Sequence, residues 1–364
     1  MTARGPTLHS DVTDLAPLTT LRLGGPAGRI VEARSEDEVI AAVRDADAAS
    51  EPLLLLAGGS NVVISDRGFP GTVLRLLTRG IESRGDGLLE VQAGEPWDPF
   101  VERSVAEGLA GIECLSGIPG SVGATPIQNV GAYGQDVSET IVGVRVYDRR
   151  SGRVEELSNE ACEFTYRSST FKRNPGRWIV LAVTFGLDRQ TESRPIGYAE
   201  LALTLGVELG ATARLRDVRE AVLALRRRKG MVIDPDDPDS VSAGSFFTNP
   251  ILEPADFEAL RRRVGDSNGD EAGPPGFPEP DGRVKTSAAW LVERSGFGRG
   301  YGMPGPAAIS TKHSLALTNR GGATTAELLA LAHEVADGVE REMGVRLVPE
   351  PVLVGEQWAP TAEG

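Results

Sequence analysis

Hydrophobic residues recur at helical spacing in several segments of the chain. Ser35-Glu-Asp-Glu38 has the form of a capping box, and the apolar residues Val39, Ile40 and Val43 follow it, which predicts a helix. A second capping box, Thr324-Thr-Ala-Glu327, predicts a long helix that ends at Gly344. The same periodicity predicts further helices over residues 98–108, 216–229, 256–264 and 287–294.

Short apolar runs between these segments predict strands. Residues 52–56 include four consecutive leucines and end in Gly58-Gly59, and residues 142–147 and 180–185 are rich in β-branched and aromatic side chains. Residues 231–239, rich in proline and aspartate, predict a linker or domain boundary, and residues 265–282 predict a polar loop. The mixture of helices and strands predicts an α+β architecture in about three pieces.

Length and charge limit the classes of function. A chain of 364 residues is long for one core, so we expect two or three domains. The net charge of −14 argues against a non-specific nucleic-acid or membrane binder, because its field repels phosphate. The sequence MTARGPTLHS lacks an apolar segment, and no apolar run approaches the ~18 residues of a membrane span. We therefore expect a cytoplasmic protein.

Metal-ligating residues are few and dispersed. The two cysteines, Cys114 and Cys162, and the three histidines show no ligand spacing, so we expect no metal. His333-Glu-Val-Ala-Asp337 resembles the zinc-protease pattern HExxH, but aspartate stands where the second histidine belongs. We expect His333 to lie on a helix surface.

Two glycine-rich segments carry the first chemical signal. Leu56-Ala-Gly-Gly-Ser-Asn-Val62 follows a predicted strand, and Gly117-Ile-Pro-Gly-Ser-Val-Gly123 follows a predicted helix. Glycines at this spacing let successive backbone N–H groups converge on a phosphate, although two turns of small residues would look the same. Neither segment matches the Rossmann fingerprint, and Gly296-Phe-Gly298 has Tyr301 in place of the third glycine. A phosphate-bearing cofactor held in another way is therefore the favoured interpretation.

Six segments together identify a family resemblance. AGGSNVVIS, GIPGSVGATPIQNVGAYGQ, YRSSTFK, AGSFFTNP, WLVERSGFGRGYG and VRLVPEPVLVG occur in the order found in the UDP-N-acetylenolpyruvoylglucosamine reductase family, from about Leu23 to Val354. The resemblance implies a two-lobed FAD-binding domain of the vanillyl-alcohol-oxidase (PCMH) type over residues 1–78 and 79–228. A C-terminal α+β substrate-binding domain over residues 229–364 would follow, with its last residues able to pack back on the first lobe.

The resemblance also implies a reaction. Non-covalent FAD, reduced by NADPH, would deliver hydride to the enolpyruvyl group of UDP-N-acetylglucosamine enolpyruvate, giving UDP-N-acetylmuramate for peptidoglycan synthesis. Ser60 or Asn61 stands where covalent flavin oxidases of the superfamily often carry histidine, so we expect dissociable FAD. The expected flavin contacts are Gly58, Gly59, Ser60, Asn61, Gly117, Ile118, Gly120, Ser121, Gly123 and Ala124.

Three residues resemble the catalytic residues of the family. Ser245 would donate a proton to the carbon beside the one that accepts hydride, where negative charge develops. Arg167 would hold the developing enolate with its forked guanidinium, and Glu350, between two prolines, would orient the reacting group or help to move the proton. Without the resemblance, Arg167 would be read as a surface charge and Glu350 as a residue at a strand end.

Substrate contacts are expected from three more residues. Tyr198 resembles a tyrosine that one subclass of the family folds over the substrate, and its alternative is a half-buried strand aromatic. Lys229 resembles a lysine that reaches the diphosphate, though it also suits a helix end. Asn249 offers donor and acceptor groups, and Phe246 and Phe247 would anchor the strand of Ser245. Family members commonly carry lysine where this chain has Thr248, which puts a phosphate contact there in doubt.

Two rival functions remain compatible with parts of the sequence. The glycine segments would also suit a hydroxy-acid oxidase or dehydrogenase of the same flavoprotein superfamily, but YRSSTFK and AGSFFTNP argue against it. A module that binds FAD or a nucleotide sugar without turnover would not need Arg167, Ser245 and Glu350 together.

Overall fold

The computed structural model describes residues 7–9, 14–268 and 273–358, and the chain divides into two compact units. The first unit comprises Met1–Thr13, Ala27–Gly59 and Phe69–Val232, and the second comprises Asp14–Pro26, Ser60–Gly68 and Ile233–Gly364. Two short N-terminal segments are thus built into the C-terminal unit. The division of residues 1–78 from 79–228 as separate lobes stays a prediction.

A mixed sheet forms one part of the first unit, with strands in the order β1-β2-β5-β3. The strands β2 (Ala27–Ala33), β5 (Phe69–Leu76) and β3 (Leu53–Leu56) are parallel, and β1 (Thr7–His9) pairs antiparallel with β2. Helix α1 (Glu36–Ala48) connects β2 to β3, and the Ser35 side chain accepts a hydrogen bond from the Glu38 N–H. The predicted N-terminal cap of this helix is confirmed.

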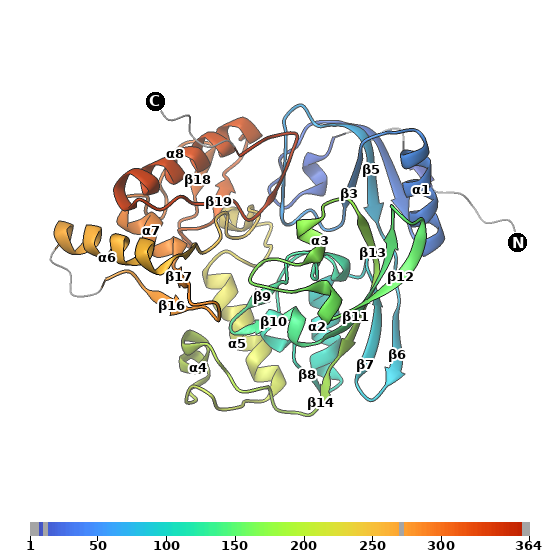
Figure 1. Ribbon diagram of the computed structural model, residues 1–364, viewed down its shortest axis with the longest axis horizontal. Helices are drawn as coiled ribbons and strands as arrows, with labels where there is room; N and C mark the ends of the chain where they lie inside the picture. The colour runs from blue at the N-terminus through green and yellow to red at the C-terminus, as the bar shows by residue number, and fades with distance from the viewer. Residues whose placement is uncertain (1–6, 10–13, 269–272, 359–364) are drawn as a thin grey trace, which may run out of the picture. The chain divides into compact units, whose positions relative to one another are not determined.

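A five-stranded antiparallel sheet forms the larger part of the first unit, in the order β12-β11-β13-β7-β6 (Figure 1). Its strands are β6 (Ile81–Gly85), β7 (Leu88–Gln92), β11 (Ile141–Asp148), β12 (Arg153–Ser158) and β13 (Trp178–Gly186). Helix α2 (Trp97–Ala106) packs on this sheet, and the rings of Trp97 and Phe100 lie 5.9 and 5.1 Å from that of Phe185. These aromatic contacts form the centre of its core.

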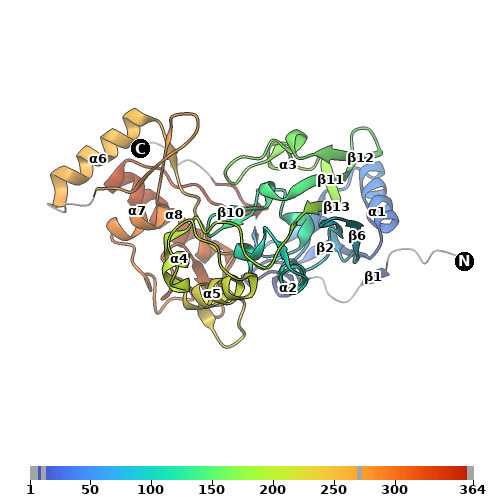
Figure 2. The same cartoon turned by 90° about the horizontal axis from the view of Figure 1, so that it is seen from below.

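Smaller elements complete the first unit. Helices α4 (Ala199–Leu205) and α5 (Leu215–Arg228) lie side by side (Figure 2) and bury Leu201, Val218 and Val222 between them with Cys114. The others are α3 (Thr170–Arg173) and the strand pairs β8 (Leu109–Ala110) with β14 (Asp188–Arg189) and β9 (Gly131–Ala132) with β10 (Gln135–Asp136).

The second unit is built around helix α8 (Thr325–Met343). Its N-terminus has the predicted capping box of Thr324 and Glu327, and it ends at Gly344 in the left-handed conformation. Around it lie α6 (Pro254–Asn268), α7 (Ala288–Arg294) and the antiparallel strands β18 (Ala307–Ile309) and β19 (Leu317–Asn319). The remaining strands are β15 (Ile251–Leu252), β17 (Val284–Thr286) and β16 (Gly276–Pro278) in one sheet, and β4 (Val62–Ile64) parallel to β20 (Val352–Val354).

Single turns of 3₁₀-helix connect several of these elements. They are η2 (Glu113–Leu115), η3 (Val122–Ala124), η4 (Val137–Glu139) and η5 (Glu160–Cys162) in the first unit, and η1 (Ala16–Leu18) and η6 (Pro238–Ser240) in the second. Within the described ranges, no helix has the length and apolar character needed to cross a membrane.

Two local predictions differ from the structure. The loop predicted over residues 265–282 is wrong in part, because α6 continues to Asn268 and strand β16 follows; residues 269–272 of that loop lie outside the described residues. His333 lies in α8 as expected, but the ring of Trp358 stacks on it at a centroid distance of 4.1 Å. Its side chain is therefore half-buried, because a C-terminal residue that no local pattern connects to the helix covers it.

Candidate functional site

The two glycine segments meet inside the first unit. A Cβ atom on Gly58 would lie 2.7 Å from the Cα atom of Gly120, closer than any side chain could approach a backbone. Gly117 and Gly120 also have φ angles of +72° and +119°, which favour glycine. The glycines thus allow two loops, 62 positions apart in the sequence numbering (120 − 58), to touch through their backbones.

An ion pair fixes the start of the second glycine segment. The Gly117 N–H donates to Asp98 Oδ1 at 2.6 Å, and the guanidinium of Arg219 donates to both oxygens of Asp98 at 2.6 and 3.0 Å. Burial favours the neutral acid, but the hydrogen bonds from Arg219 and Gly117 outweigh it and lower the pKa of Asp98. Sequence reasoning missed both side chains, because nothing local connects one helix terminus to a cation 121 residues away.

Several N–H groups of this segment already bind protein acceptors. Those of Val122, Gly123 and Ala124 donate to the carbonyl oxygens of Glu95, Ala93 and Ser121. A Cβ on Gly123 would lie 2.5 Å from that of Ala93. In this conformation Gly123 and Ala124 fix the shape of the loop. Their N–H groups are used by the protein, so they would help to hold a cofactor by shaping the loop and not by donating hydrogen bonds to it.

Ser121 gives the segment a polar group suited to a ligand. Its hydroxyl is buried and has no hydrogen-bond partner among the described residues, an arrangement that costs free energy unless a bound molecule satisfies it. It lies next to Gly120, whose backbone is in close contact with Gly58 of the other glycine segment. These features fit a phosphate-bearing cofactor such as FAD.

Ser60 and Asn61, also predicted to contact the flavin, belong to the second unit. There the Asn61 carbonyl accepts from the Val352 N–H at 3.0 Å, and its amide nitrogen lies 3.5 Å from the Glu350 carbonyl oxygen. The segment that carries Asn61 is therefore joined to the segment that carries Glu350.

Arg167 lies in a tight turn of the first unit with a left-handed backbone, φ +51°. Its guanidinium donates to the carbonyl oxygens of Asn129 and Gly131, at 3.3 and 2.6 Å. Asn129 in turn donates to the carbonyl of Thr165 at 3.1 Å, so the turn and residues 129–131 hold each other. The orientation of the guanidinium plane is thus fixed by the backbone of the GIPGSVGATPIQNVGAYGQ segment.

The predicted substrate residues Tyr198 and Lys229 share a partner in the same unit. The ring of Tyr133 contacts that of Tyr198 edge-on at 5.3 Å and lies 5.9 Å from Lys229 Nζ. Lys229 also forms an ion pair with Glu200 at 2.6 Å, and burial raises the pKa of Tyr133 to about 12. Sequence reasoning missed Tyr133 and Glu200, although Tyr133 stands inside a segment that carried the family resemblance.

Ser245 begins a short extended segment in the second unit. The Phe246 N–H donates to the Leu315 carbonyl, and the Glu350 N–H donates to the Phe246 carbonyl. Phe247 also forms an isolated antiparallel β-bridge with Pro349. Phe246 and Phe247 are buried, which confirms their predicted role as anchors. The structure therefore brings the segments of Ser245 and Glu350 together as hydrogen-bonded neighbours.

Two other polar side chains act near this segment. Asn249 Oδ1 accepts the Ala288 N–H at the start of α7 at 3.0 Å, which leaves its amide N–H groups for any substrate contact. Ser245 Oγ lies 3.2 Å from Nε2 of His313, a residue that the sequence does not single out because it belongs to no motif and shows no ligand spacing.

Comparisons with known proteins agree with this picture. Residues 27–158 match the family described as FAD binding domain, and residues 236–354 match the C-terminal domain of UDP-N-acetylenolpyruvoylglucosamine reductase. The predicted fold class, an α+β protein with an FAD-binding domain of the PCMH type and a C-terminal domain, is confirmed.

Relatives and a solved structure extend the match over nearly the whole chain. The UDP-N-acetylenolpyruvoylglucosamine reductase of Streptomyces coelicolor is 59% identical over 94% of this chain and 89% of its own length. That of Thermobifida fusca is 58% identical over 94% of this chain and 96% of its own length. The crystal structure of the reductase from Thermus caldophilus, 23% identical, has the same fold, with a TM-score of 0.64 over 96% of this chain and 99% of its own. The chain therefore belongs to the UDP-N-acetylenolpyruvoylglucosamine reductase family of FAD-dependent oxidoreductases.

Proposed function

We propose that the chain uses NADPH and non-covalent FAD to reduce the enolpyruvyl group of UDP-N-acetylglucosamine enolpyruvate to UDP-N-acetylmuramate. The observation that carries this proposal is the hydrogen bond and isolated β-bridge that join the segments of Ser245 and Glu350 in a chain with an FAD-binding domain. The cytoplasm is part of the proposal, because nucleotide-activated sugars and NADPH are cytoplasmic metabolites.

Bound FAD would supply hydride transfer, and the chain's own side chains would manage charge and protons. Ser245 would protonate the carbon next to the one that receives hydride, because a carbanion-like centre is basic enough to take a hydroxyl proton. Arg167, with its plane fixed by two carbonyl oxygens, would stabilise the enolate. Glu350 would orient the reacting group.

Substrate binding is assigned to a second group of residues. Tyr198 would cover the substrate, with its ring supported edge-on by Tyr133, and Lys229 would contact the diphosphate. The amide of Asn249 would donate to a polar group of the sugar nucleotide. Ser121 and the paired glycine loops would hold FAD in the first unit.

Separate measurement of the two half-reactions tests this proposal. Anaerobic NADPH should bleach the flavin absorbance of the purified protein, and UDP-N-acetylglucosamine enolpyruvate should then restore it. Ser245→Ala should leave bleaching intact and slow restoration by ~10²–10⁴-fold, the range for a lost general acid. Ser295→Ala is the matched control, because it removes a buried hydroxyl that has no partner among the described residues.

Two outcomes would contradict the proposal. If Ser245→Ala slowed both half-reactions equally, Ser245 would be a structural residue. If a hydroxy acid reduced the flavin and oxygen reoxidised it, while the UDP-sugar had no effect, the chain would be an oxidase of the wider superfamily.

A further inference from the structure

His313 is tied to Ser245 in a way that none of the roles above uses. Its Nε2 atom lies 3.2 Å from Ser245 Oγ, within hydrogen-bonding distance. Both residues belong to the second unit, and both are partly buried. A neutral imidazole can donate from Nε2 in one of its two tautomers, so this contact can supply a hydrogen bond to the serine oxygen.

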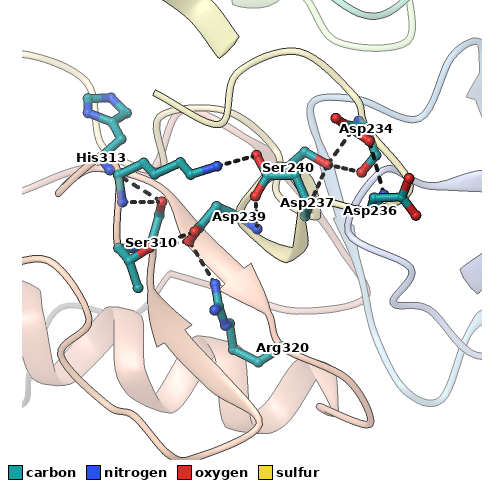
Figure 3. Close-up of polar contacts among 10 residues, drawn as sticks. Asp234, Asp236, Asp237, Asp239, Ser240, Ser310, His313 and Arg320 are labelled. Carbon is teal, nitrogen blue, oxygen red and sulfur yellow. Dashed lines mark hydrogen bonds and ion pairs between the residues drawn. The ribbon is translucent and has the colours of Figure 1, made fainter. Parts of the chain in front are cut away.

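The loop between β18 and β19 holds the backbone of His313 in place (Figure 3). Ser310 Oγ accepts the N–H groups of Lys312 and His313, at 3.0 and 3.2 Å. The His313 carbonyl accepts the Ala316 N–H at 3.1 Å, and the Ser310 N–H donates to the Ala316 carbonyl at 2.8 Å. Four hydrogen bonds thus close a loop of seven residues, 310–316, around the histidine.

Asp239 fastens this loop to the segment that the sequence predicted to be a domain boundary (Figure 3). Its carboxylate accepts from the N–H and the hydroxyl of Thr311 at 2.8 and 2.6 Å, and from the guanidinium of Arg320 at 2.7 Å. The side chain of Asp239 is only 5% exposed, so these bonds are shielded from water. Lys312 makes a second attachment, to Asp237 at 2.8 Å.

The segment of Ser245 is attached to the same loop. The Phe246 N–H donates to the carbonyl of Leu315 at 2.7 Å, two residues after His313. The serine and the histidine are therefore held at fixed points of one hydrogen-bonded assembly that begins at Asp239. Such an arrangement fixes the distance between their side chains more closely than either side chain could alone.

We propose that His313 is a positioning residue that donates a hydrogen bond from Nε2 to Ser245 Oγ. This inference rests on the proposed function of Ser245 as proton donor. With the oxygen occupied by the imidazole N–H, the serine proton points elsewhere and is available to the substrate carbon. When the O–H bond breaks and the new C–H bond forms, the same imidazole N–H stabilises the alkoxide. A proton from water restores the hydroxyl after the product leaves.

Two substitutions of His313 test this role. His313→Ala should leave flavin bleaching by NADPH within twofold of the original rate, and should slow flavin reoxidation by the UDP-sugar by about 10–100-fold, the effect of one lost hydrogen bond to a developing charge. His313→Gln should recover most of that loss, because the glutamine amide can donate from a similar position. Arg341→Gln is the control from the same unit, because its side chain is 68% exposed and pairs with its sequence neighbour Glu342, so it should change neither half-reaction.

The double variant Ser245→Ala/His313→Ala separates failure of this inference from failure of the proposed function. If His313 acts through Ser245, the double variant should be no slower than Ser245→Ala alone. Reoxidation by His313→Ala within twofold of the original rate, or no recovery in a folded His313→Gln, would overturn the positioning role and leave Ser245 as donor. If Ser245→Ala itself reoxidised normally, the proposed function would fail first.

Discussion

The glycine loops of the first unit and the Ser245 segment of the second unit are built by opposite means. The loops depend on atoms that are missing, since Gly58 and Gly120 approach to a distance that excludes any Cβ. The Ser245 segment depends on atoms that are present, since its neighbours Glu350 and His313 are attached to it through hydrogen bonds. A larger side chain at Gly58 or Gly120 should therefore disrupt the glycine loops. In the Ser245 segment, loss of a polar or charged group should matter more than a change in side-chain size.

The largest expected effect comes from adding one carbon to the glycine loops. Gly58→Ala places Cβ against the Gly120 backbone, which cannot move as a side-chain end could, and overpacking of this kind costs about 3 kcal/mol. If the strain falls on the FAD-bound conformation, FAD affinity should fall by roughly 150-fold, measured by flavin titration of the apoprotein.

Gly197→Ala is the matched control, because a Cβ there would meet no atom within 4 Å. Equal FAD affinity in both variants would mean that the loops separate when the cofactor binds. In that case the close approach of Gly58 and Gly120 would belong only to the unliganded protein.

Glu350→Gln tests the Ser245 segment, because it keeps the volume of the side chain and removes its charge. We expect it to impair the reaction and not the fold. The backbone bond from the Glu350 N–H to the Phe246 carbonyl does not involve the side chain, so FAD content and melting temperature should stay unchanged. Reoxidation by the UDP-sugar should slow by about 10²-fold, within the range for acid–base groups. Normal reoxidation would leave Glu350 with a structural role in its segment.

The features that the sequence predicts are those whose partners lie close together along the chain. The helix caps at Ser35 and Thr324 are predictable, because in each the capping side chain and the N–H that it accepts lie within three residues of each other. Ser245 and Glu350 were found through motifs. His313 belongs to no such motif, because its partner lies 68 residues away. The composition of residues 231–239 predicts a linker or boundary and gives no sign of the role of Asp239, because its partners Thr311 and Arg320 are also distant in sequence.

A third test concerns a charged side chain that serves the backbone of a glycine loop. Asp98→Asn keeps the shape of the acceptor of the Gly117 N–H but removes the charge facing Arg219, and should lower the free energy of unfolding by about 1–2 kcal/mol. Asp86→Asn, in an exposed turn of the same unit, is the control.

The effect of Asp98 should depend on pH in a definite direction. Because its pKa is lower in the folded than in the unfolded chain, its stabilisation is present above pH ~4 and is lost as pH falls through the folded-state value. The melting temperatures of the original protein and Asp98→Asn should therefore converge in acid. If the difference between the two melting temperatures stayed constant with pH, the charge of Asp98 would not be what stabilises the fold.

The smallest expected effect concerns a pair that competes with the substrate. Lys229 is bound to Glu200 at 2.6 Å, and both side chains are about a third exposed, at 32% and 40%. A diphosphate that uses Lys229 must replace this contact, which is worth only ~0.2–1 kcal/mol at such exposure. Glu200→Gln should therefore lower the KM for the UDP-sugar by about 2–5-fold at constant kcat, while Glu208→Gln, an exposed carboxylate on the following loop, should change neither. A higher KM would mean that Glu200 holds Lys229 in its productive position, so that in the first unit, too, a side-chain contact prepares the site.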